Sequence, residues 1–323
     1  MSQRIVFAIL LTFLCVGCGK ESSSKSTSGP TKITLQLNWK PEPEFGGFYA
    51  AQVNGNYAKN GLDVEITPGG ASAPTMQMVG AGTVPFAIVN GYEIIRARAN
   101  GNLVVALFAV YQTNPQGIMT RASRGFTSIQ DIFTHPGTLA MERGLPYSDF
   151  LQKKYGFDKL KIVPSPFGNL SIYRTDPNYA MQCFVTSEPL AARKAGIEPQ
   201  TFLIAESGYN PYTTVLATSE SYLKANPAVV KSMIQSVREG WQAYLADPTK
   251  ANDLMARLNT TMDADTFKEC AQAQISLIQT DSGNGSDLGM MNISRWQTLV
   301  QQLVDLKAID KPVAAQDCFY KPQ

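Results

Sequence analysis

Histidine is nearly absent from this chain of 323 residues, in which His135, followed by Pro136, is the only one. Histidine-rich zinc sites, the H-E-x-x-H motif and Ser-His-Asp triads all need histidines that the chain lacks, and no G-x-S-x-G motif occurs. Neither dinucleotide nor P-loop glycine motifs are present, so Gly69-Gly70 and Gly80-Ala81-Gly82 indicate turns. We therefore expect no catalytic residues, no metal site and no cofactor.

Charge is also sparse. Charged residues make up 17% of the chain and leave a net charge of +2, with acids and bases interspersed. A nucleic-acid surface needs a basic stripe, which this distribution does not supply, so nucleic acid is not an expected partner. The chain is 44% hydrophobic, and the roughly 290 residues beyond its N-terminal segment suffice for two lobes with buried cores.

The N-terminal apolar run, Ile5 to Val16, is shorter than the about 20 residues that span a bilayer, and it predicts a secretion signal. The segment Leu14-Cys15-Val16-Gly17-Cys18 resembles the bacterial lipobox, although its leucine lies one position further from Cys18 than is usual. We expect residues 1–18 to be a lipoprotein signal peptide and Cys18 to carry the lipid. The exported protein would then be anchored to a membrane, in the periplasm or on the outer cell surface, through a flexible Ser-rich tether of residues 19–31. The alternative is an ordinary signal peptide with two incidental cysteines.

Three cysteines remain for the folded part: Cys183, Cys270 and Cys318. They form no C-x-x-C motif, so a thiolate metal site is not expected. An oxidising compartment permits one disulfide, for which Cys270 and Cys318 are the favoured pair. Three buried, unpaired cysteines are an equally weighted alternative.

Strand and helix patterns alternate along most of the chain. The first strand alternates polar and apolar residues from Lys32 to Asn38 and stops at a loop that contains two prolines. Strand–helix–strand units join parallel strands, so the pattern predicts an α/β fold. We expect strands at residues 32–38, 62–66, 86–89, 103–111, 160–163 and 201–205, and helices at residues 45–53, 73–80, 92–99, 147–155 and 178–185.

The C-terminal part is predicted to be helical. Asn226 is a suitable helix cap, Pro227 fits the first turn, and apolar residues then recur three or four apart. Those apolar residues are Val230, Met233, Val237, Trp241 and Tyr244. Two further helices are expected near residues 264–278 and 294–306.

Aromatic and amide side chains follow the predicted strands. Asn38, Trp39, Phe45 and Tyr49 come after the first strand, and Asn90, Tyr92 and Glu93 come after the third. Ligands of open parallel sheets bind at the carboxyl ends of strands, and flat aromatic walls suit a flat, largely neutral ligand. The alternative is that Phe45, Phe48 and Tyr49 form the buried face of their helix. Glu42 and Glu44, in the proline-rich loop, are expected to be solvated.

Residues 37–52 read Leu37-Asn-Trp-Lys-Pro-Glu-Pro-Glu-Phe-Gly-Gly-Phe-Tyr-Ala-Ala-Gln52. With this segment begins a close resemblance to the NMT1/THI5-like (SsuA/THI5 type) periplasmic substrate-binding proteins of ABC transporters. It continues through Gly61-Leu-Asp-Val-Glu-Ile66, Ser187-Glu188-Pro189 and Tyr209-Asn-Pro-Tyr212, and covers most of residues 32–248. It implies a two-lobed α/β fold of the periplasmic-binding-protein type II class with a helical C-terminal segment. Residues 32–115 with 206–323 would form lobe 1, and residues 116–205 would form lobe 2.

The resemblance implies a receptor that closes on a small molecule and delivers it to an ABC-transporter permease. Ligands in the family include thiamine-precursor aminopyrimidines and riboflavin, and close relatives take up nitrate, sulfonates or taurine. It implies ligand contacts at Asn38, Trp39, Tyr49, Asn90 and Glu188, and it departs from many members in having Phe45 where they have histidine. The full set of candidate contacts is Asn38, Trp39, Phe45, Tyr49, Asn90, Glu93, Tyr147, Glu188 and Tyr212.

Two other functions compete with the receptor. The enzymatic branch of the family makes the thiamine pyrimidine with pyridoxal phosphate, but this chain lacks its histidine and its cysteine-rich motif, and export also argues against it. A sensory role ranks last. Oxyanions are usually bound by arginines or backbone N–H donors, whereas the predicted loops contain mainly aromatic, amide and carboxylate side chains. We therefore expect a neutral or cationic heteroaromatic ligand, with nitrate, sulfonate or taurine as the alternative.

Overall fold

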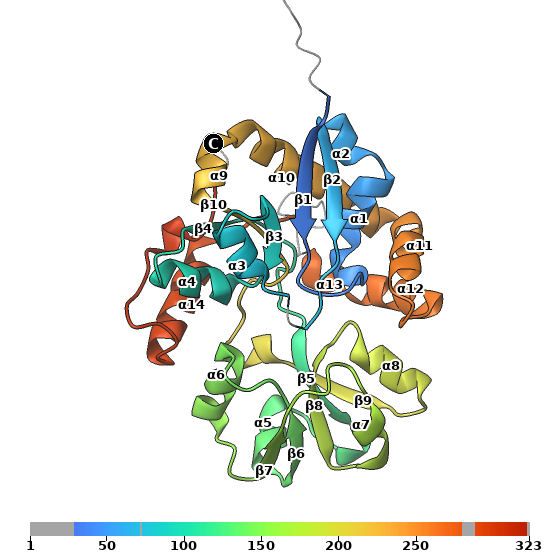
Figure 1. The fold of residues 1–323 in the computed structure, drawn as a ribbon. Helices are drawn as coiled ribbons and strands as arrows, with labels where there is room; N and C mark the ends of the chain where they lie inside the picture. The colour runs from blue at the N-terminus through green and yellow to red at the C-terminus, as the bar shows by residue number, and fades with distance from the viewer. Residues whose placement is uncertain (1–28, 72, 280–287, 322–323) are drawn as a thin grey trace, which may run out of the picture.

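The computed structural model describes residues 29–71, 73–279 and 288–321. The predicted signal peptide, Cys18 and residues 19–28 of the predicted tether lie outside them. Two five-stranded sheets, each covered by helices, form an upper and a lower lobe (Figure 1). None of the helices in the described ranges combines the length and the apolar character that crossing a bilayer requires.

The sheet of lobe 1 has the strand order β2-β1-β3-β10-β4. β1 pairs in parallel with β2 and β3, because helices connect these strands, whereas β10 is antiparallel to β3 and β4. Its strands are β1 (Thr31–Gln36), β2 (Leu62–Thr67), β3 (Phe86–Val89), β4 (Val104–Ala109) and β10 (Val215–Ser219).

The sheet of lobe 2 repeats this arrangement with the order β7-β6-β8-β5-β9. β6 is parallel to β7 and β8, and β5 is antiparallel to β8 and β9. In each sheet the fourth strand has just arrived from the other lobe, β5 directly after β4 and β10 directly after β9. The strands are β5 (Gln116–Arg121), β6 (Gly137–Ala140), β7 (Leu160–Val163), β8 (Tyr179–Phe184) and β9 (Pro199–Leu203).

The chain therefore passes between the lobes through two crossover segments, residues 110–115 and residues 208–214. Lobe 1 carries the helical C-terminal part of the chain, whereas α5 to α8 cover lobe 2 (Figure 1). The helices are α1 (Gly46–Val53), α2 (Asn56–Lys59), α3 (Thr75–Gly80), α4 (Gly91–Ala99), α5 (Ile129–Thr134), α6 (Pro146–Tyr155), α7 (Ser171–Thr175), α8 (Glu188–Lys194), α9 (Glu220–Ala225), α10 (Pro227–Ala246), α11 (Thr249–Leu258), α12 (Ala264–Ala273), α13 (Ile275–Ile278) and α14 (Ile293–Asp305). Short 3-10 helices occupy η1 (Pro43–Phe45), η2 (Ala122–Arg124), η3 (Ile204–Ser207) and η4 (Ala315–Asp317).

Helix α10 fixes the position of α1, the helix that follows the proline-rich loop. Trp241 of α10 is fully buried and meets Phe48 of α1 edge to face, with ring centroids 6.0 Å apart. A Cβ atom on Gly240 would lie 2.2 Å from the carbonyl oxygen of Gly47, so the two backbones touch and only glycine fits. The end of the loop that follows β1 is thereby held against a rigid support.

The α/β class predicted from the sequence is confirmed, and so are most of the predicted elements of lobe 1. One prediction for lobe 2 is wrong: the helix expected at residues 178–185 is the strand β8. The segment Tyr179–Phe184 contains good helix formers, but it lies between β6 and β5 and is largely buried, so sheet pairing overrides its local preference. The strand at residues 137–140 and the helix at residues 188–194 were not predicted at all.

The favoured disulfide is not present. Cys183, Cys270 and Cys318 are all buried free thiols, as in the alternative of three unpaired cysteines. Burial raises the pKa of each thiol, which keeps it in the protonated and unreactive form.

Candidate functional site

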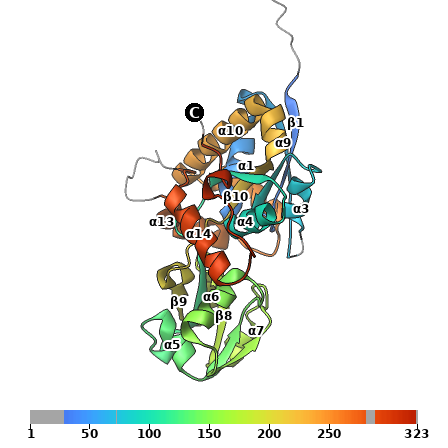
Figure 2. The ribbon, with the colours of Figure 1, turned by 90° about the vertical axis from the view of Figure 1, so that its left-hand side faces the viewer.

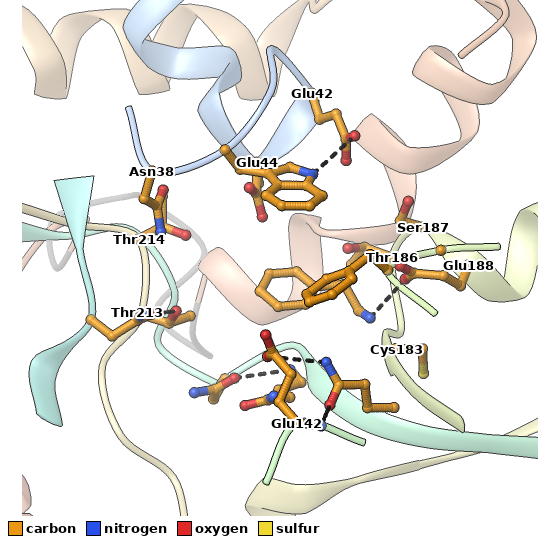
Figure 3. Close-up of a pocket in the computed structure, with 18 of the residues that line it drawn as sticks. Asn38, Glu42, Glu44, Glu142, Cys183, Thr186, Ser187, Glu188, Thr213 and Thr214 are labelled. Atoms are coloured by element: carbon orange, nitrogen blue, oxygen red, sulfur yellow. Dashed lines mark hydrogen bonds between the residues drawn. The ribbon is translucent and has the colours of Figure 1, made fainter. Parts of the chain in front are cut away.

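A cavity of about 400 Å³ lies between the two lobes (Figure 3). Its walls are the loops that follow β1, β2 and β3 in lobe 1 and β6, β7 and β8 in lobe 2, together with the crossover segments. The carboxyl ends of parallel strands meet at one edge of a sheet, and here the two edges face each other. The lining includes Asn38, Trp39, Glu42, Glu44, Asn90, Asn114, Glu142, Tyr147, Phe167, Gln182, Cys183, Phe184, Glu188, Tyr209, Tyr212, Thr213 and Cys270.

Two aromatic rings face each other across the cavity. Trp39 follows β1 in lobe 1, and Phe167 lies in the loop between β7 and α7 in lobe 2. Their ring centroids are 6.4 Å apart and their planes differ by 30°. Phe167 has a φ of 47° and is 54% exposed, an unusual combination for a large aromatic residue. A strained backbone that presents an apolar ring to a cavity is typical of a binding site.

Carboxylic acids dominate the polar part of the wall. Glu42, Glu44, Glu142 and Glu188 line the cavity, and no lysine, arginine or histidine of the described residues lines it. Figure 3 shows Glu42 and Glu44 above, on the side of lobe 1, and Glu188 and Glu142 below, on the side of lobe 2. With no basic residue in the described lining, these four acids favour cations and hydrogen-bond donors over anions.

Two buried amide side chains hold the loop that carries Glu42 and Glu44. Gln274 donates from Nε2 to the carbonyl oxygen of Pro43 at 2.9 Å, and Asn259 donates from Nδ2 to the carbonyl oxygen of Pro41 at 3.1 Å. Gln274 also accepts a hydrogen bond of 2.6 Å from the hydroxyl group of Tyr111. These amides lie at the ends of α11 and α12, so the helical C-terminal part shapes the wall of the cavity.

Glu42 and Glu44 are not the solvated loop acids that the sequence suggested. Burial, with the nearby charge of Glu188, raises the pKa of Glu42 to about 7, although the indole Nε1 of Trp39 donates to its Oε1 at 3.3 Å. Burial and the charges of Glu42 and Glu188 raise the pKa of Glu44 well above its usual range. The prediction was wrong because contacts with residues more than 200 positions away enclose the loop.

Glu188 is the first residue of α8, where Pro189 follows it. Its Oε2 accepts a hydrogen bond of 2.8 Å from the backbone N–H of Phe184 at the end of β8. Burial raises the pKa of Glu188, and backbone hydrogen bonds oppose that rise because they favour the charged carboxylate. One carboxylate oxygen is thus fixed by the backbone.

Glu142 takes part in a network on the floor of the cavity. Its backbone N–H donates to Oε1 of Gln182 at 2.6 Å and to the hydroxyl oxygen of Tyr147 at 3.1 Å. Nε2 of Gln182 donates to Oε2 of Glu142 at 3.2 Å, and the hydroxyl group of Tyr147 also donates to Gln182. The network joins the end of β6, α6 and β8, and so fixes the position of the carboxylate.

Amide and hydroxyl groups supply the remaining polar wall. Asn90 caps α4, its side-chain oxygen accepts from the hydroxyl group of Thr213 at 2.5 Å, and its Nδ2 donates to Oε2 of Glu93 at 3.0 Å. The side-chain oxygen of Asn38 and the hydroxyl group of Tyr209 are buried and have no hydrogen-bond partner within the described part of the chain. Buried polar atoms of this kind normally have partners, so both are suited to a bound molecule.

Six of the candidate contacts from the sequence line the cavity, namely Asn38, Trp39, Asn90, Tyr147, Glu188 and Tyr212. The structure places Phe45 and Tyr49 elsewhere: they are 0% and 1% exposed and pack in the core of lobe 1 with Phe48, which corrects their assignment to the cavity wall. Glu93 is also absent from the lining, because its carboxylate accepts from the backbone N–H of Asn90 at 2.7 Å and caps α4. That these six residues contact a ligand stays a prediction.

Several lining residues escaped the sequence analysis. Glu142 follows the unpredicted strand β6, and Gln182 lies in the strand that was mistaken for a helix. Correct placement of these strands would have put both residues at the cavity edge. Phe167 lies in a loop, and no local pattern sets it apart from other exposed apolar residues. No group of three His, Cys, Asp or Glu side chains in residues 29–71, 73–279 and 288–321 is arranged as a metal site.

A sequence profile described as NMT1/THI5-like matches residues 42–251. Over 98% of both chains, the protein is 20% identical to the formylaminopyrimidine-binding protein of Halalkalibacterium halodurans. It is 22% identical to the riboflavin-binding protein RibY of Chloroflexus aurantiacus, over 99% of this chain and 97% of that protein.

A more partial match is the 4-amino-5-hydroxymethyl-2-methylpyrimidine phosphate synthase THI12 of Saccharomyces cerevisiae, at 24% identity over 74% of this chain and 76% of the synthase. Among solved structures, the aliphatic sulphonate binding protein SsuA of Escherichia coli superposes with a TM-score of 0.70. The alignment covers 91% of this chain and 94% of that protein at 12% identity, a level that establishes the shared fold only.

The raised pKa of Glu42 predicts that the cavity acid destabilises the unliganded protein above neutral pH. The folded state holds the proton up to about pH 7, whereas the ordinary value is 4.5, so this group's contribution to stability falls as the pH rises from 4.5 through 7. We expect Glu42→Gln, which keeps an acceptor for Trp39, to raise the free energy of unfolding by on the order of 1–3 kcal/mol at pH 8 and by little at pH 5.

Thermal or urea melts of wild type and variant at both pH values measure this difference. The matched control is Glu65→Gln, which removes an exposed acid of β2 and should have little effect at either pH. An equal effect of Glu42→Gln at pH 5 and pH 8 would show that Glu42 does not titrate between them.

Proposed function

The chain belongs to the NMT1/THI5-like family, and from this premise we propose that it is a solute-binding receptor for a small heteroaromatic molecule that carries amino groups, of the aminopyrimidine class. The observation that carries the proposal is the cavity between the lobes, with four acids, no basic residue from the described part of the chain, and two facing aromatic rings. Two relatives that align over almost the whole chain are named for binding a formylaminopyrimidine and riboflavin; both names support a heteroaromatic ligand, and the first supports the aminopyrimidine class.

The aromatic pair supports a flat ligand. A planar ring stacked between two others needs about 7 Å between the outer rings, since carbon atoms in contact lie about 3.5 Å apart. The ring centroids of Trp39 and Phe167 lie 6.4 Å apart, and the two residues belong to different lobes. A small rotation of one lobe against the other opens or closes this gap, so a ring held between them would favour the closed form.

The acids support amino groups on that ring. Glu188 has one oxygen fixed by the backbone N–H of Phe184, and its carboxylate can accept further hydrogen bonds from a ligand. An aminopyrimidine presents an exocyclic amine and a ring nitrogen, which becomes cationic when protonated, to such an edge. A flavin presents mostly carbonyl acceptors to the same wall, so it is the second choice. Nitrate and sulfonates would meet four acids and no basic residue of the described lining.

A synthase is less well supported. Chemistry with pyridoxal phosphate requires a lysine beside the cofactor, and the described cavity residues include neither lysine nor histidine. The phosphate of that cofactor would also lie among carboxyl groups. The geometry therefore favours reversible binding over chemical transformation of the ligand.

Thermal shift across a panel of 4-amino-5-hydroxymethyl-2-methylpyrimidine, riboflavin, taurine, an alkanesulfonate and nitrate tests the proposal. A molecule that binds only the folded state raises the melting temperature, so the aminopyrimidine should give the largest rise. Shifts with sulfonates or nitrate but not with the aminopyrimidine would overturn the ligand class. No shift with the panel or with a metabolite extract would contradict the receptor itself.

Delivery to an ABC-transporter permease and attachment to the membrane through Cys18 complete the proposed role. If Cys18 carries lipid, cells that produce the protein should incorporate a labelled fatty acid into it, and Cys18→Ala should abolish the label while Cys15→Ala retains it. Labelling that persists in Cys18→Ala would contradict the anchor.

Glu188→Gln should weaken binding of 4-amino-5-hydroxymethyl-2-methylpyrimidine by about 1.5–3 kcal/mol, because a charged hydrogen bond is lost. Titration calorimetry measures the change. Glu206→Gln, which alters an exposed acid of η3, serves as the matched control and should bind like wild type. Unchanged binding in Glu188→Gln would remove Glu188 from the site.

Phe167→Leu keeps an apolar side chain of similar reach and removes the flat ring. We expect it to weaken binding by about 0.5–1.5 kcal/mol, the range typical of aromatic stacking. Ile172→Ala, at another exposed apolar residue of lobe 2, is the control and should leave affinity unchanged. If calorimetry finds Phe167→Leu equal to wild type, the ligand does not stack on this ring.

A further inference from the structure

Arg295, in the first turn of α14, joins the two crossover segments that connect the lobes. Its Nη1 donates to the carbonyl oxygen of Gln112 in the first crossover segment at 2.6 Å. In the second crossover segment, Nε donates to the carbonyl oxygen of Asn210 at 2.7 Å, and Nη2 donates to Oδ1 of Asn210 at 2.9 Å and to the carbonyl oxygen of Pro211 at 3.1 Å. One guanidinium group thus holds both connections.

The two crossover segments are also bonded to each other next to Arg295. The backbone N–H of Asn114 donates to Oδ1 of Asn210 at 2.9 Å, and Nδ2 of Asn114 donates to the carbonyl oxygen of Pro211 at 3.1 Å. Oδ1 of Asn210 therefore accepts from both Asn114 and Arg295. Asn114 itself lines the cavity, so this cluster reaches the proposed ligand.

Arg295 also supports Tyr212, a residue of the cavity wall. The guanidinium carbon lies 3.9 Å from the centre of the Tyr212 ring, within the range of a cation–π contact. The hydroxyl oxygen of Tyr212 accepts from the backbone N–H of Asn292, the cap of α14, at 2.7 Å. Residues at the start of α14 therefore hold the Tyr212 side chain both on the face of its ring and at its hydroxyl group.

No carboxylate within the described ranges forms an ion pair with Arg295. Burial without an acidic partner disfavours the charged form and lowers the pKa of the guanidinium group. A partly buried charge of this kind costs stability unless its hydrogen bonds compensate. What arginine adds is a planar fork that reaches several acceptors at once.

Helix α14 lies beside the junction and touches lobe 2 as well. Figure 2 shows it reaching down to the level at which the two lobes meet. Gln302 donates from Nε2 to the carbonyl oxygen of Gly208 at 2.8 Å, and Nζ of Lys153 in α6 donates to the carbonyl oxygen of Asp305 at 3.0 Å. Helix α14 therefore contacts the junction between the lobes from its first turn to its last.

We propose that Arg295 is a positioning residue for ligand capture: it makes the two crossover segments move as one hinge and holds Tyr212 against the cavity. The inference rests on the proposed receptor function for its purpose, but its physical content concerns the unliganded protein. Without the fork, each crossover segment bends independently, so the lobes sample more relative orientations and fewer of them bring the two halves of the cavity together.

Hydrogen–deuterium exchange on the unliganded full chain tests the hinge directly. In Arg295→Gln we expect amides of residues 110–115 and 208–214 to exchange about tenfold faster or more, while α5 and β6, inside lobe 2, keep their wild-type rates. Arg295→Lys preserves the charge but cannot span both segments, so it should protect one segment better than the other. If both segments exchange as in wild type while the melting temperature falls, Arg295 is only a stabilising residue.

A second variant and a binding readout keep the test decisive. Asn210→Ala removes the shared acceptor and should loosen the same two segments if Arg295→Gln does not fold. With 4-amino-5-hydroxymethyl-2-methylpyrimidine as the probe, Arg295→Lys should bind more weakly in proportion to the loosened hinge. If wild type itself does not bind the probe, the ligand class fails while the exchange result still decides the hinge. Loosened segments with unchanged affinity would overturn the role in capture.

Discussion

Burial of carboxyl groups in a poorly solvated cavity raises their pKa, and the charge of Glu188 raises the pKa of Glu42 and Glu44 further; this cost is the constraint around which the site is organised. Glu42, Glu44 and Glu188 face one cavity whose described lining contains no basic residue, and the pKa of each is raised. Such an arrangement costs stability in the empty protein. A bound amine or cation would relieve this cost, and the relief would favour the liganded form in addition to the ligand contacts themselves.

Contacts elsewhere in the fold hold these acidic side chains in place. The close contact of α1 with α10 holds the element that follows the acidic loop, and the amides of Asn259 and Gln274 fix the loop itself. On the opposite wall, the network of Glu142 with Gln182 keeps a fourth acid in place. The two crossover segments connect the lobes, and Arg295 binds both of them. In the receptor that we propose, a ligand that relieves the cost of the buried acids would favour closure of the lobes.

Much of lobe 1 could be predicted from the sequence, because its strands are short alternating or apolar runs bounded by glycine and proline. Strand β3 is such an apolar run, and β1 is an alternating run that ends before a loop with two prolines. Lobe 2 was harder, since β8 contains residues that favour a helix and becomes a strand only by pairing with β6 and β5. The burial of Glu42 and Glu44 depends on Asn259 and Gln274, far along the chain, and no local signal reports such contacts. Trp39 was found because it follows the first strand directly, whereas its partner Phe167 lies in a loop of the other lobe.

The central claim is that the acids of the cavity recognise amino groups on a flat ring. The most direct test is to compare, by titration calorimetry, 4-amino-5-hydroxymethyl-2-methylpyrimidine with the same ring bearing an oxo group in place of the 4-amino group. The two molecules have nearly the same shape and differ at the edge that a carboxylate would contact. We expect the amino compound to bind at least about 100-fold more tightly than the oxo compound, which is the discrimination expected when a buried polar group loses its partner. Equal affinity, or tighter binding of the oxo compound, would contradict it.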